Sequence, residues 1–187
     1  MDIEKYKDII RPLMSERRYN HSVNVSIEAV RLAEKYGEDT EKAALAGILH
    51  DITKEFEEQK QLQIFDSGDI ILTDVEKNTT KLWHAISGSV YIQTHLNIDD
   101  ADVINAIRYH TTGRANMSLL EKIIFLADFT SAERDYPDVD VIRQKADVSL
   151  EEGMLYGIQF TLANLLKRQG CISEDALSAY NEIILNR

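Results

Sequence analysis

The chain has 187 residues, of which 44% are hydrophobic and 28% are charged, and it contains only 8 Gly and 2 Pro. These values predict one folded domain over residues 1–187 with a sizeable core, and they exclude long disordered segments. The formal net charge of −11 excludes broad binding to nucleic acid or to anionic membranes, because both are polyanions.

Two features bear on the location of the protein. Cys171 is the only cysteine, so no intrachain disulfide can form, and no basic segment followed by an apolar signal core stands at the N-terminus. The longest apolar runs are far shorter than the roughly 18 to 20 residues that span a bilayer. The sequence therefore predicts a cytoplasmic protein that does not cross a membrane.

Apolar residues return at spacings of three and four along most of the chain, which predicts six to eight helices and almost no strands. One early helix carries His21 on the same face as Val25 and Ala29 and ends near Gly37. The next helix is expected to begin with Thr40 as its N-cap.

Start signals mark the later helices as well. Three capping boxes are predicted, in which a Ser or Thr side chain and a Glu three residues later satisfy each other's backbone donors. They are Thr73 with Glu76, Ser118 with Glu121, and Ser149 with Glu152. Ser173 is a simpler N-cap, and Gly170 suits a helix C-terminus. Extended irregular segments are expected only at residues 66–72 and 129–139.

His50 and Asp51 are the most informative pair in the sequence. They follow an almost wholly apolar helical segment, residues 43–49, and so enter a poorly solvated environment. Burying both without partners would be costly. A divalent cation over this helix end would accept both side chains and offset the desolvation of the carboxylate.

Two further residues extend this candidate metal site. Asp128 continues the inward face of Leu120 and Ile124, and the neutral imidazole of His21 is a common metal ligand. Four helices would then converge on one ion. The alternative is that each residue is a hydrogen-bonded polar group of the core. No His-Glu-x-x-His motif and no Cys pair offers a competing metal site.

The remaining histidines differ in their surroundings. His84 and His110 lie beside small residues, and each is a candidate for phosphate contact, for a second metal position or for protonation of a leaving group. His95 is expected on the surface, because eleven residues of helix would separate it from His84 by roughly 16 Å.

The ordered set of His21, the pair His50-Asp51, and Asp128 resembles the signature of the HD-domain phosphohydrolase superfamily. More closely, four segments resemble the YqeK family: residues 18–21, 49–54, 109–113 and 126–128, the last followed by Arg134-Asp135-Tyr136-Pro137. This resemblance implies a single-domain, all-α, HD-type helical bundle. It also implies symmetrical hydrolysis of diadenosine tetraphosphate to two ADP with iron or a similar metal.

The resemblance further implies roles for individual residues. The metal ligands would be His21, His50, Asp51 and Asp128. Residues placed around the nucleotide would be Arg18, Lys54, His84, His110, Thr111, Thr112, Gly113 and Arg134. The catalytic residues would be Asp51, His84 and His110, and the two histidines could instead ligate a second ion.

Such a site supports phosphoanhydride hydrolysis, because a metal can lower the pKa of a bound water to about 7 and the resulting hydroxide can attack phosphorus. Arg18, Lys54 and Arg134 would stabilise charge on the phosphoryl oxygens, and His110 or His84 would protonate the leaving group. Two alternatives stay open: a nucleotidase or phosphatase acting on mononucleotides, and a non-catalytic nucleotide-sensing HD domain.

Ligand chemistry narrows the metal without choosing it. Imidazole nitrogen and carboxylate oxygen suit iron, manganese, cobalt, nickel and zinc, and the resemblance favours iron. The oligomeric state is equally open. Apolar residues on the last helix, Ile183, Ile184 and Leu185, would either form the seam of a homodimer or close the protein's own core.

Overall fold

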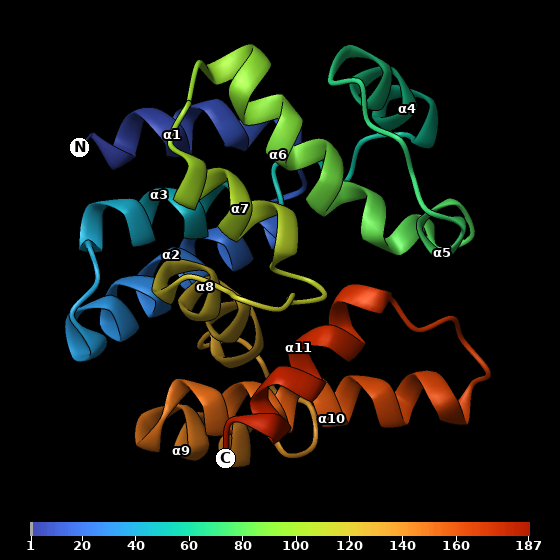
Figure 1. Cartoon of the computed structure of the whole chain (residues 1–187). Coiled ribbons are helices and arrows are strands. Elements are labelled where there is room, and N and C mark those ends of the chain that lie inside the picture. The colour runs from blue at the N-terminus through green and yellow to red at the C-terminus, as the bar shows by residue number, and fades with distance from the viewer. Residues whose placement is uncertain (1) are drawn as a thin grey trace.

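The computed structural model describes residues 2–187, and all regular secondary structure in that range is helical (Figure 1). The α-helices are α1 Ile3–Ile10, α2 Glu16–Tyr36, α3 Thr40–Leu49, α4 Glu58–Ser67, α5 Asp74–Lys77, α6 Trp83–Leu96, α7 Ala101–Tyr109, α8 Leu119–Thr130, α9 Val139–Val148, α10 Leu150–Lys167 and α11 Glu174–Leu185. Short 3-10 turns stand at Arg11–Leu13 and Thr80–Leu82. The all-α prediction is confirmed.

The predicted number of six to eight helices is too low, since residues 2–187 form eleven α-helices. Helix α5 is a single turn of four residues, which is too short to show a periodic pattern. Helices α9 and α10 are separated only by Ser149, so their patterns merge in the sequence.

Most of the predicted caps form. Both halves of the capping box are present at Thr73 with Glu76 and at Ser118 with Glu121. Ser149 accepts a hydrogen bond from the Glu152 N–H at 3.1 Å, but the Glu152 carboxylate pairs with Lys145 instead of returning to the cap. The prediction of a full box at this position is therefore wrong.

The N-cap of α3 is Asp39 rather than Thr40. Its carboxylate accepts hydrogen bonds from the N–H groups of Glu41 and Lys42 at 2.8 and 3.1 Å, and its backbone is extended. Thr40 already has helical geometry and is the first residue of α3. The two adjacent residues are both good N-caps, so the sequence did not separate them.

The predicted helix C-termini at Gly37 and Gly170 agree with the structure more closely than the predicted N-caps do. Gly37 caps α2 in the left-handed conformation with φ of 79°. The Gly170 N–H donates to the Leu165 carbonyl at 2.8 Å, while Gln169 takes the left-handed position with φ of 56°. The irregular segments begin later than predicted, because α4 continues to Ser67 and α8 to Thr130.

Helices α2, α3, α7 and α8 pack around the main core, and α9 and α10 cover α8 from the other side (Figure 1). Buried side chains such as Val25, Leu49 and Ile124 fill this core. A smaller cluster of Phe65, Trp83 and Ile86 joins α4 to α6 at the edge of the molecule. Within residues 2–187, no helix combines the length and the apolar character that a bilayer crossing requires.

Helices α2 and α3 approach each other very closely at Gly47. A Cβ atom on this residue would lie 2.7 Å from the Cα of Ser26, a distance that real Cβ atoms essentially never show. Only glycine permits this contact between the two backbones. The contact lies near His50 along α3 and thereby sets how closely His50 approaches His21 on α2.

The last helix splits its apolar residues between the core and the surface. Ile183 packs against the core, whereas Ile184 and Leu185 are 40% and 81% exposed. Part of the segment therefore closes the protein's own core. The homodimer stays a prediction.

Candidate metal centre

Four predicted site residues meet where α2, α3 and α8 converge. The Nε2 atoms of His21 and His50 are 3.2 Å apart, and Asp51 Oδ2 lies 3.3 Å from the Nε2 of His50. Asp128 Oδ1 lies 3.1 Å from the Nε2 of His21. Three helices supply these groups rather than the predicted four, because His50 and Asp51 share the C-terminal end of α3.

The four side chains differ in burial. His21, His50 and Asp51 are 6%, 0% and 2% exposed, which agrees with the expected poorly solvated environment. The Asp128 side chain is 21% exposed and so lies at the mouth of the cluster rather than inside the core. The cluster is therefore buried on one side and accessible on the other.

His84 and His110 complete the cluster from α6 and from the end of α7. Their Nε2 atoms are 3.1 Å apart, and they lie 3.2 and 3.6 Å from Asp51 Oδ1. The imidazole rings follow one another from His21 to His50, His110 and His84, with centroid separations of 5.1, 5.0 and 5.0 Å. Asp51 touches all four rings and is the centre of the arrangement.

Three of the imidazoles have a fixed orientation. The Nδ1–H groups of His50 and His110 donate to the carbonyls of Gly47 and Ile107, each at 2.7 Å. The Nδ1–H of His21 donates to a carboxylate oxygen of Glu133. A proton fixed on Nδ1 leaves the Nε2 lone pair of the neutral ring directed into the cluster, which is the usual arrangement of metal-binding histidines.

His84 differs from these three. Its ring nitrogens lie 3.2 and 3.0 Å from Lys54 Nζ, and among residues 2–187 no carbonyl or carboxylate accepts from its Nδ1. Burial lowers the pKa of His84 well below its usual value, and the nearby Lys54 acts in the same direction. His84 is therefore a neutral imidazole whose proton is free to reside on Nε2.

The donor set fits a divalent cation. Asp51 Oδ1 is buried and has no hydrogen bond of normal geometry with any described residue. The Nε2 atoms of His21 and His50 face each other at 3.2 Å with a lone pair on each, and an ion between them is what makes such a pair favourable. Ligands about 2.1 Å from one ion lie about 3.0 to 3.4 Å apart, close to the separations between these atoms.

The carboxylates are ionised in this environment. Burial alone would raise the pKa of Asp51, but the neighbouring imidazoles of His50, His110 and His84 outweigh it and hold the pKa well below its usual range. Burial likewise opposes ionisation of Asp128, and the hydrogen bond with His21 and the charge of Arg134 lower its pKa well below the ordinary value. Ionised carboxylates are the form that binds metal ions.

Cationic groups surround the cluster as predicted. Arg18 Nη1 donates to Asp51 Oδ2 at 2.6 Å, and Arg134 donates to Asp128. Lys54 Nζ lies 3.9 Å from Asp51 Oδ1, and burial lowers the pKa of this amine. These three groups supply the local positive charge that an anionic substrate needs in a protein of net charge −11.

The Tyr-His-Thr-Thr-Gly segment reaches the cluster only in part. Thr111 Oγ1 lies 3.2 Å from the Nε2 of His110 and 3.4 Å from that of His84. Thr112 Oγ1 donates to the Gly113 carbonyl at 2.9 Å. Gly113 adopts φ of 67° and packs beside Met117 and Phe125, so its place in the motif is explained by the turn.

Several charged residues lie away from the cluster. Arg108 pairs with Glu76, and Arg114 pairs with Glu121, both at 2.6 Å. His95 is exposed and stacks on Tyr91, which confirms its surface assignment.

Two residues near the cluster were missed from the sequence. Glu133 orients His21 and also accepts a hydrogen bond from the Asn24 side chain at 2.8 Å. Arg17 lies in the first turn of α2 beside Arg18. Glu133 lies in an irregular segment with no periodic pattern, so nothing in the sequence indicates that its side chain points toward the cluster. The pair of arginines preceding His21 was the one available hint for Arg17.

Two cavities adjoin the cluster. The arginine cavity, of about 240 Å³, lies at the His21 end and is lined by Arg17, Arg18, His21 and residues 133–136. The apolar cavity, of about 170 Å³, begins at Thr111 and is lined by Thr111, Thr112, Phe125, Ile158, Leu162 and Leu165 among others.

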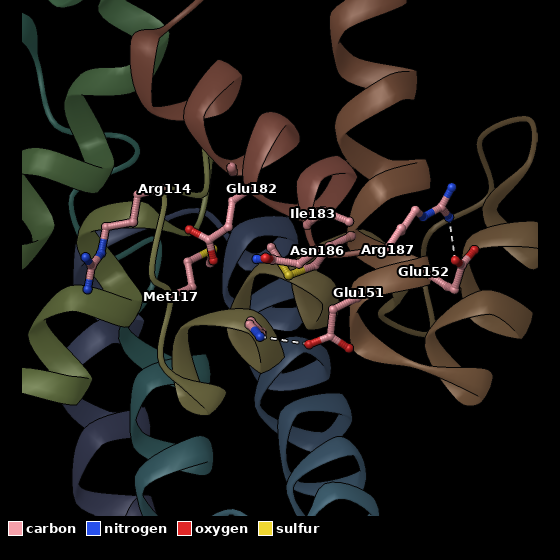
Figure 2. Close-up of a pocket in the computed structure, with 11 residues that line it drawn as sticks. Arg114, Met117, Glu151, Glu152, Glu182, Ile183, Asn186 and Arg187 are labelled. Atoms are coloured by element: carbon pink, nitrogen blue, oxygen red, sulfur yellow. Dashed lines mark hydrogen bonds and ion pairs between the residues drawn. The ribbon is translucent and has the colours of Figure 1, made fainter.

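Figure 2 shows a further cavity, of about 210 Å³, between α8, α10 and α11. This C-terminal cavity is lined by Arg114, Met117, Lys122, Glu151, Glu182 and Arg187 among others. None of the clustered His and Asp residues lines it.

Comparison with known proteins places this geometry in a family. The model of the HD domain family matches residues 18–133, a range that contains His21, His50-Asp51 and Asp128. The chain belongs to the HD domain family. The HD signature thus coincides with the side chains that meet in the cluster.

Relatives extend the similarity to the whole chain. A symmetrical bis(5'-nucleosyl)-tetraphosphatase of Halalkalibacterium halodurans is 37% identical over 187 residues, covering 100% of both chains. A protein of the same name from Bacillus subtilis is 35% identical over 98% of both chains. A crystal structure from Clostridium acetobutylicum, described as a "predicted HD superfamily hydrolase involved in NAD metabolism", has a TM-score of 0.96 and 37% identity, covering 100% of this chain and 99% of that one.

Membership of the HD family and the buried His and Asp cluster agree on a divalent metal as the cofactor. Three overlapping groups of potential ligands lie within 4.8 Å: His21 with His50 and Asp51, His50 with His110 and Asp128, and Asp51 with His84 and His110.

Proposed function

We propose that this HD protein hydrolyses diadenosine tetraphosphate symmetrically to two ADP, using a divalent metal for which iron is the first candidate. The observation that carries the proposal is a buried His and Asp cluster whose imidazoles are oriented as ligands and whose edge is lined by Arg18, Lys54 and Arg134. Two relatives that match nearly the full chain carry the name of this activity. The whole chain acts as one domain, located in the cytoplasm.

The metal ligands in this proposal are His21, His50, Asp51 and Asp128. These residues would hold a divalent ion, which would lower the pKa of a bound water to about 7 and so supply a nucleophile at neutral pH. Glu133 and the Gly47 carbonyl orient two of these imidazoles by accepting their Nδ1–H protons.

The basic residues bind and orient the phosphate chain. Arg18 and Arg134 each donate to a carboxylate of the cluster, and both line the cavity beside it. Guanidinium groups bind phosphate oxygens through paired hydrogen bonds, and Lys54 acts as a point charge between Asp51 and His84. Fixed charges of this kind stabilise the charge that develops during phosphoryl transfer.

The orientations of His84 and His110 separate their roles. The proton of His110 is held on Nδ1 by the Ile107 carbonyl, so its Nε2 accepts a hydrogen bond or ligates. His84 carries no such restraint and presents an Nε2–H to the departing phosphate. His84 is thus a hydrogen-bond donor to the leaving phosphate and, as a neutral imidazole, does not protonate it, whereas the Nε2 lone pair of His110 is available to an additional ion. Thr111 donates its hydroxyl beside both rings.

Product analysis tests the proposal. Freshly purified protein is subjected to elemental analysis, loaded with iron, manganese, cobalt, nickel or zinc, and given diadenosine tetraphosphate in ¹⁸O-labelled water. We expect ADP as the sole nucleotide product, with half of the ADP molecules carrying one ¹⁸O atom. Formation of AMP and ATP would refute symmetrical cleavage. Faster turnover of mononucleotides would favour the phosphatase, and ADP binding without turnover of any nucleotide would favour the sensor.

A further inference from the structure

The arginine cavity lies between the first turn of α2 and the segment that follows α8. Arg17 and Arg18 line one wall, residues 133–136 line the other, and His21 connects the cavity to the metal cluster. The volume of about 240 Å³ is adjacent to the position proposed for the reacting phosphates. A group bound in this cavity would therefore lie beside the phosphoanhydride bond that is cleaved in the proposed reaction.

The positive charge in this cavity is not matched by its own carboxylates. Arg18 and Arg134 pair with Asp51 and Asp128, while the Glu133 carboxylate is engaged by His21 and Asn24. Arg17 is exposed and forms no side-chain hydrogen bond or ion pair with any residue in the described range, and the buried Nε of Arg18 lacks an acceptor. A cation in the first turn opposes the helix dipole, and Glu16 in the same turn of α2 does not pair with Arg17.

The two cavities next to the cluster lie at different ends of the row of imidazoles. His21, at one end, lines the arginine cavity, and Thr111, which contacts His84 at the other end, lines the apolar cavity. A substrate with four phosphates between two nucleosides has two equivalent halves. Two cavities, one on each side of the reacting centre, are what such a molecule requires.

We propose that the arginine cavity binds one nucleoside diphosphate half of the substrate and that Arg17 is a positioning residue for the phosphate of that half. This inference rests on the proposed function. Arg17 supplies the unpaired guanidinium, and the exposed Asp135 carboxylate in the same cavity suits the ribose hydroxyl groups. The apolar cavity receives the other half.

The test compares Arg17→Ala with two matched variants in the metal-loaded protein. Arg17→Lys retains the charge, and Arg11→Ala removes an equal charge from an arginine that lies over the Tyr19 ring outside the cavity. We expect Arg17→Ala to raise the KM for diadenosine tetraphosphate about tenfold with little change in kcat, Arg17→Lys to restore part of the loss, and Arg11→Ala to match the wild type. Equal KM values for Arg17→Ala and the wild type, or an equal rise in Arg11→Ala, would overturn the inference.

A binding measurement separates this inference from the proposed function. Calorimetric titration of the metal-loaded wild type with ADP should give two ADP per chain, and Arg17→Ala should weaken the binding of one of them about tenfold. A single ADP per wild-type chain, or two unchanged affinities in the variant, contradicts the second subsite. If the wild type cleaves no diadenosine tetraphosphate, the proposed function fails, whatever Arg17 does. If it cleaves and Arg17→Ala binds and reacts normally, only the subsite is wrong.

Discussion

The arginine cavity and the C-terminal cavity are similar in volume, about 240 and 210 Å³, but they differ in whether the charged side chains around them have partners. Around the first, Arg17 and the Nε of Arg18 lack partners within the described structure. Around the second, every charged side chain is paired. The presence of unmatched polar groups, and not cavity volume, distinguishes the region that is suited to a ligand.

The pairs at the C-terminal cavity are specific. Arg114 donates two hydrogen bonds to Glu121 at 2.6 and 2.7 Å, and the Glu182 carboxylate accepts from the Asn116 N–H at 2.6 Å. Lys122 pairs with Glu151 at 2.8 Å, and Arg187 pairs with Glu152 (Figure 2). These contacts connect α8, α10 and α11. The C-terminal cavity is therefore a feature of helix packing whose changes should affect stability rather than activity.

The largest expected effect comes from Asp51→Asn. This change removes the carboxylate that touches all four imidazoles of the cluster. Because a catalytic metal contributes several kcal/mol to the transition state, we expect kcat/KM to fall about 10³-fold or more. Elemental analysis should show loss of the metal, and circular dichroism should show a folded protein. A variant with full metal content and full activity would remove Asp51 from the site.

A smaller effect is expected from Glu133→Gln, which weakens the acceptor for the His21 Nδ1–H. Loss of such a partner typically lowers metal affinity about 10- to 100-fold. Competition with a chelating dye measures this affinity directly. Asp140→Asn, which changes an exposed carboxylate paired with Arg143, is the matched control and should leave the affinity unchanged. Equal affinities in both variants would contradict the orienting role of Glu133.

Near the C-terminal cavity, Glu121→Gln should reduce the free energy of unfolding and leave the metal content unchanged. The Glu121 side chain is 1% exposed, binds Arg114 and closes the capping box of α8 by accepting from the Ser118 N–H at 3.2 Å. Loss of the charge weakens these bonds by about 2 kcal/mol, which lowers Tm by about 4 to 8 °C. Thermal unfolding tests this value. A loss of metal in this variant would show that the two regions are coupled.

The smallest effect is expected from Lys122→Met. Its partner Glu151 is 53% exposed, so solvent screens the pair. Such pairs contribute less than about 1 kcal/mol, and Tm should change by no more than about 3 °C. A double-mutant cycle with Glu151→Gln measures the interaction. A coupling energy well above this value would show that the exposed pair of Lys122 and Glu151 stabilises the helix packing around the C-terminal cavity more than its solvent exposure predicts.

The fold class and the meeting of the metal-ligand candidates could be predicted from the sequence, because the apolar surroundings of these residues restrict where their side chains can point. His50 and Asp51 follow a helix with almost no polar residues, and Asp128 continues a buried face, so few directions were open to them. The resemblance placed His84 and His110 around the nucleotide or at a second ion, but it did not predict the row of four imidazoles, because the relative placement of their helices depends on long-range packing. Thr112 and Gly113 belong to the same short motif as His110, yet adjacency in sequence did not bring them to the cluster.

Local ambiguities account for the remaining differences. Asp39 and Thr40 are adjacent and both suit an N-cap, and only the backbone conformation decides between them. Glu152 completes a capping pattern by spacing, but Lys145 offers its carboxylate a charged partner from the neighbouring helix α9. Glu133 and Arg17 act through contacts made across an irregular segment. Periodicity describes the faces of helices and carries no information about such segments.

The close contact at Gly47 has a consequence for the choice of ion. His21 and His50 are held apart by a distance that two main chains determine, and main chains have no rotamers with which to adjust. Ions of different radius must therefore be accommodated by the carboxylates, and Asp128, at the more open side, has the greater freedom to rotate. Rigid imidazoles with one adaptable carboxylate would allow this centre to accept several transition metals without rearranging its helices.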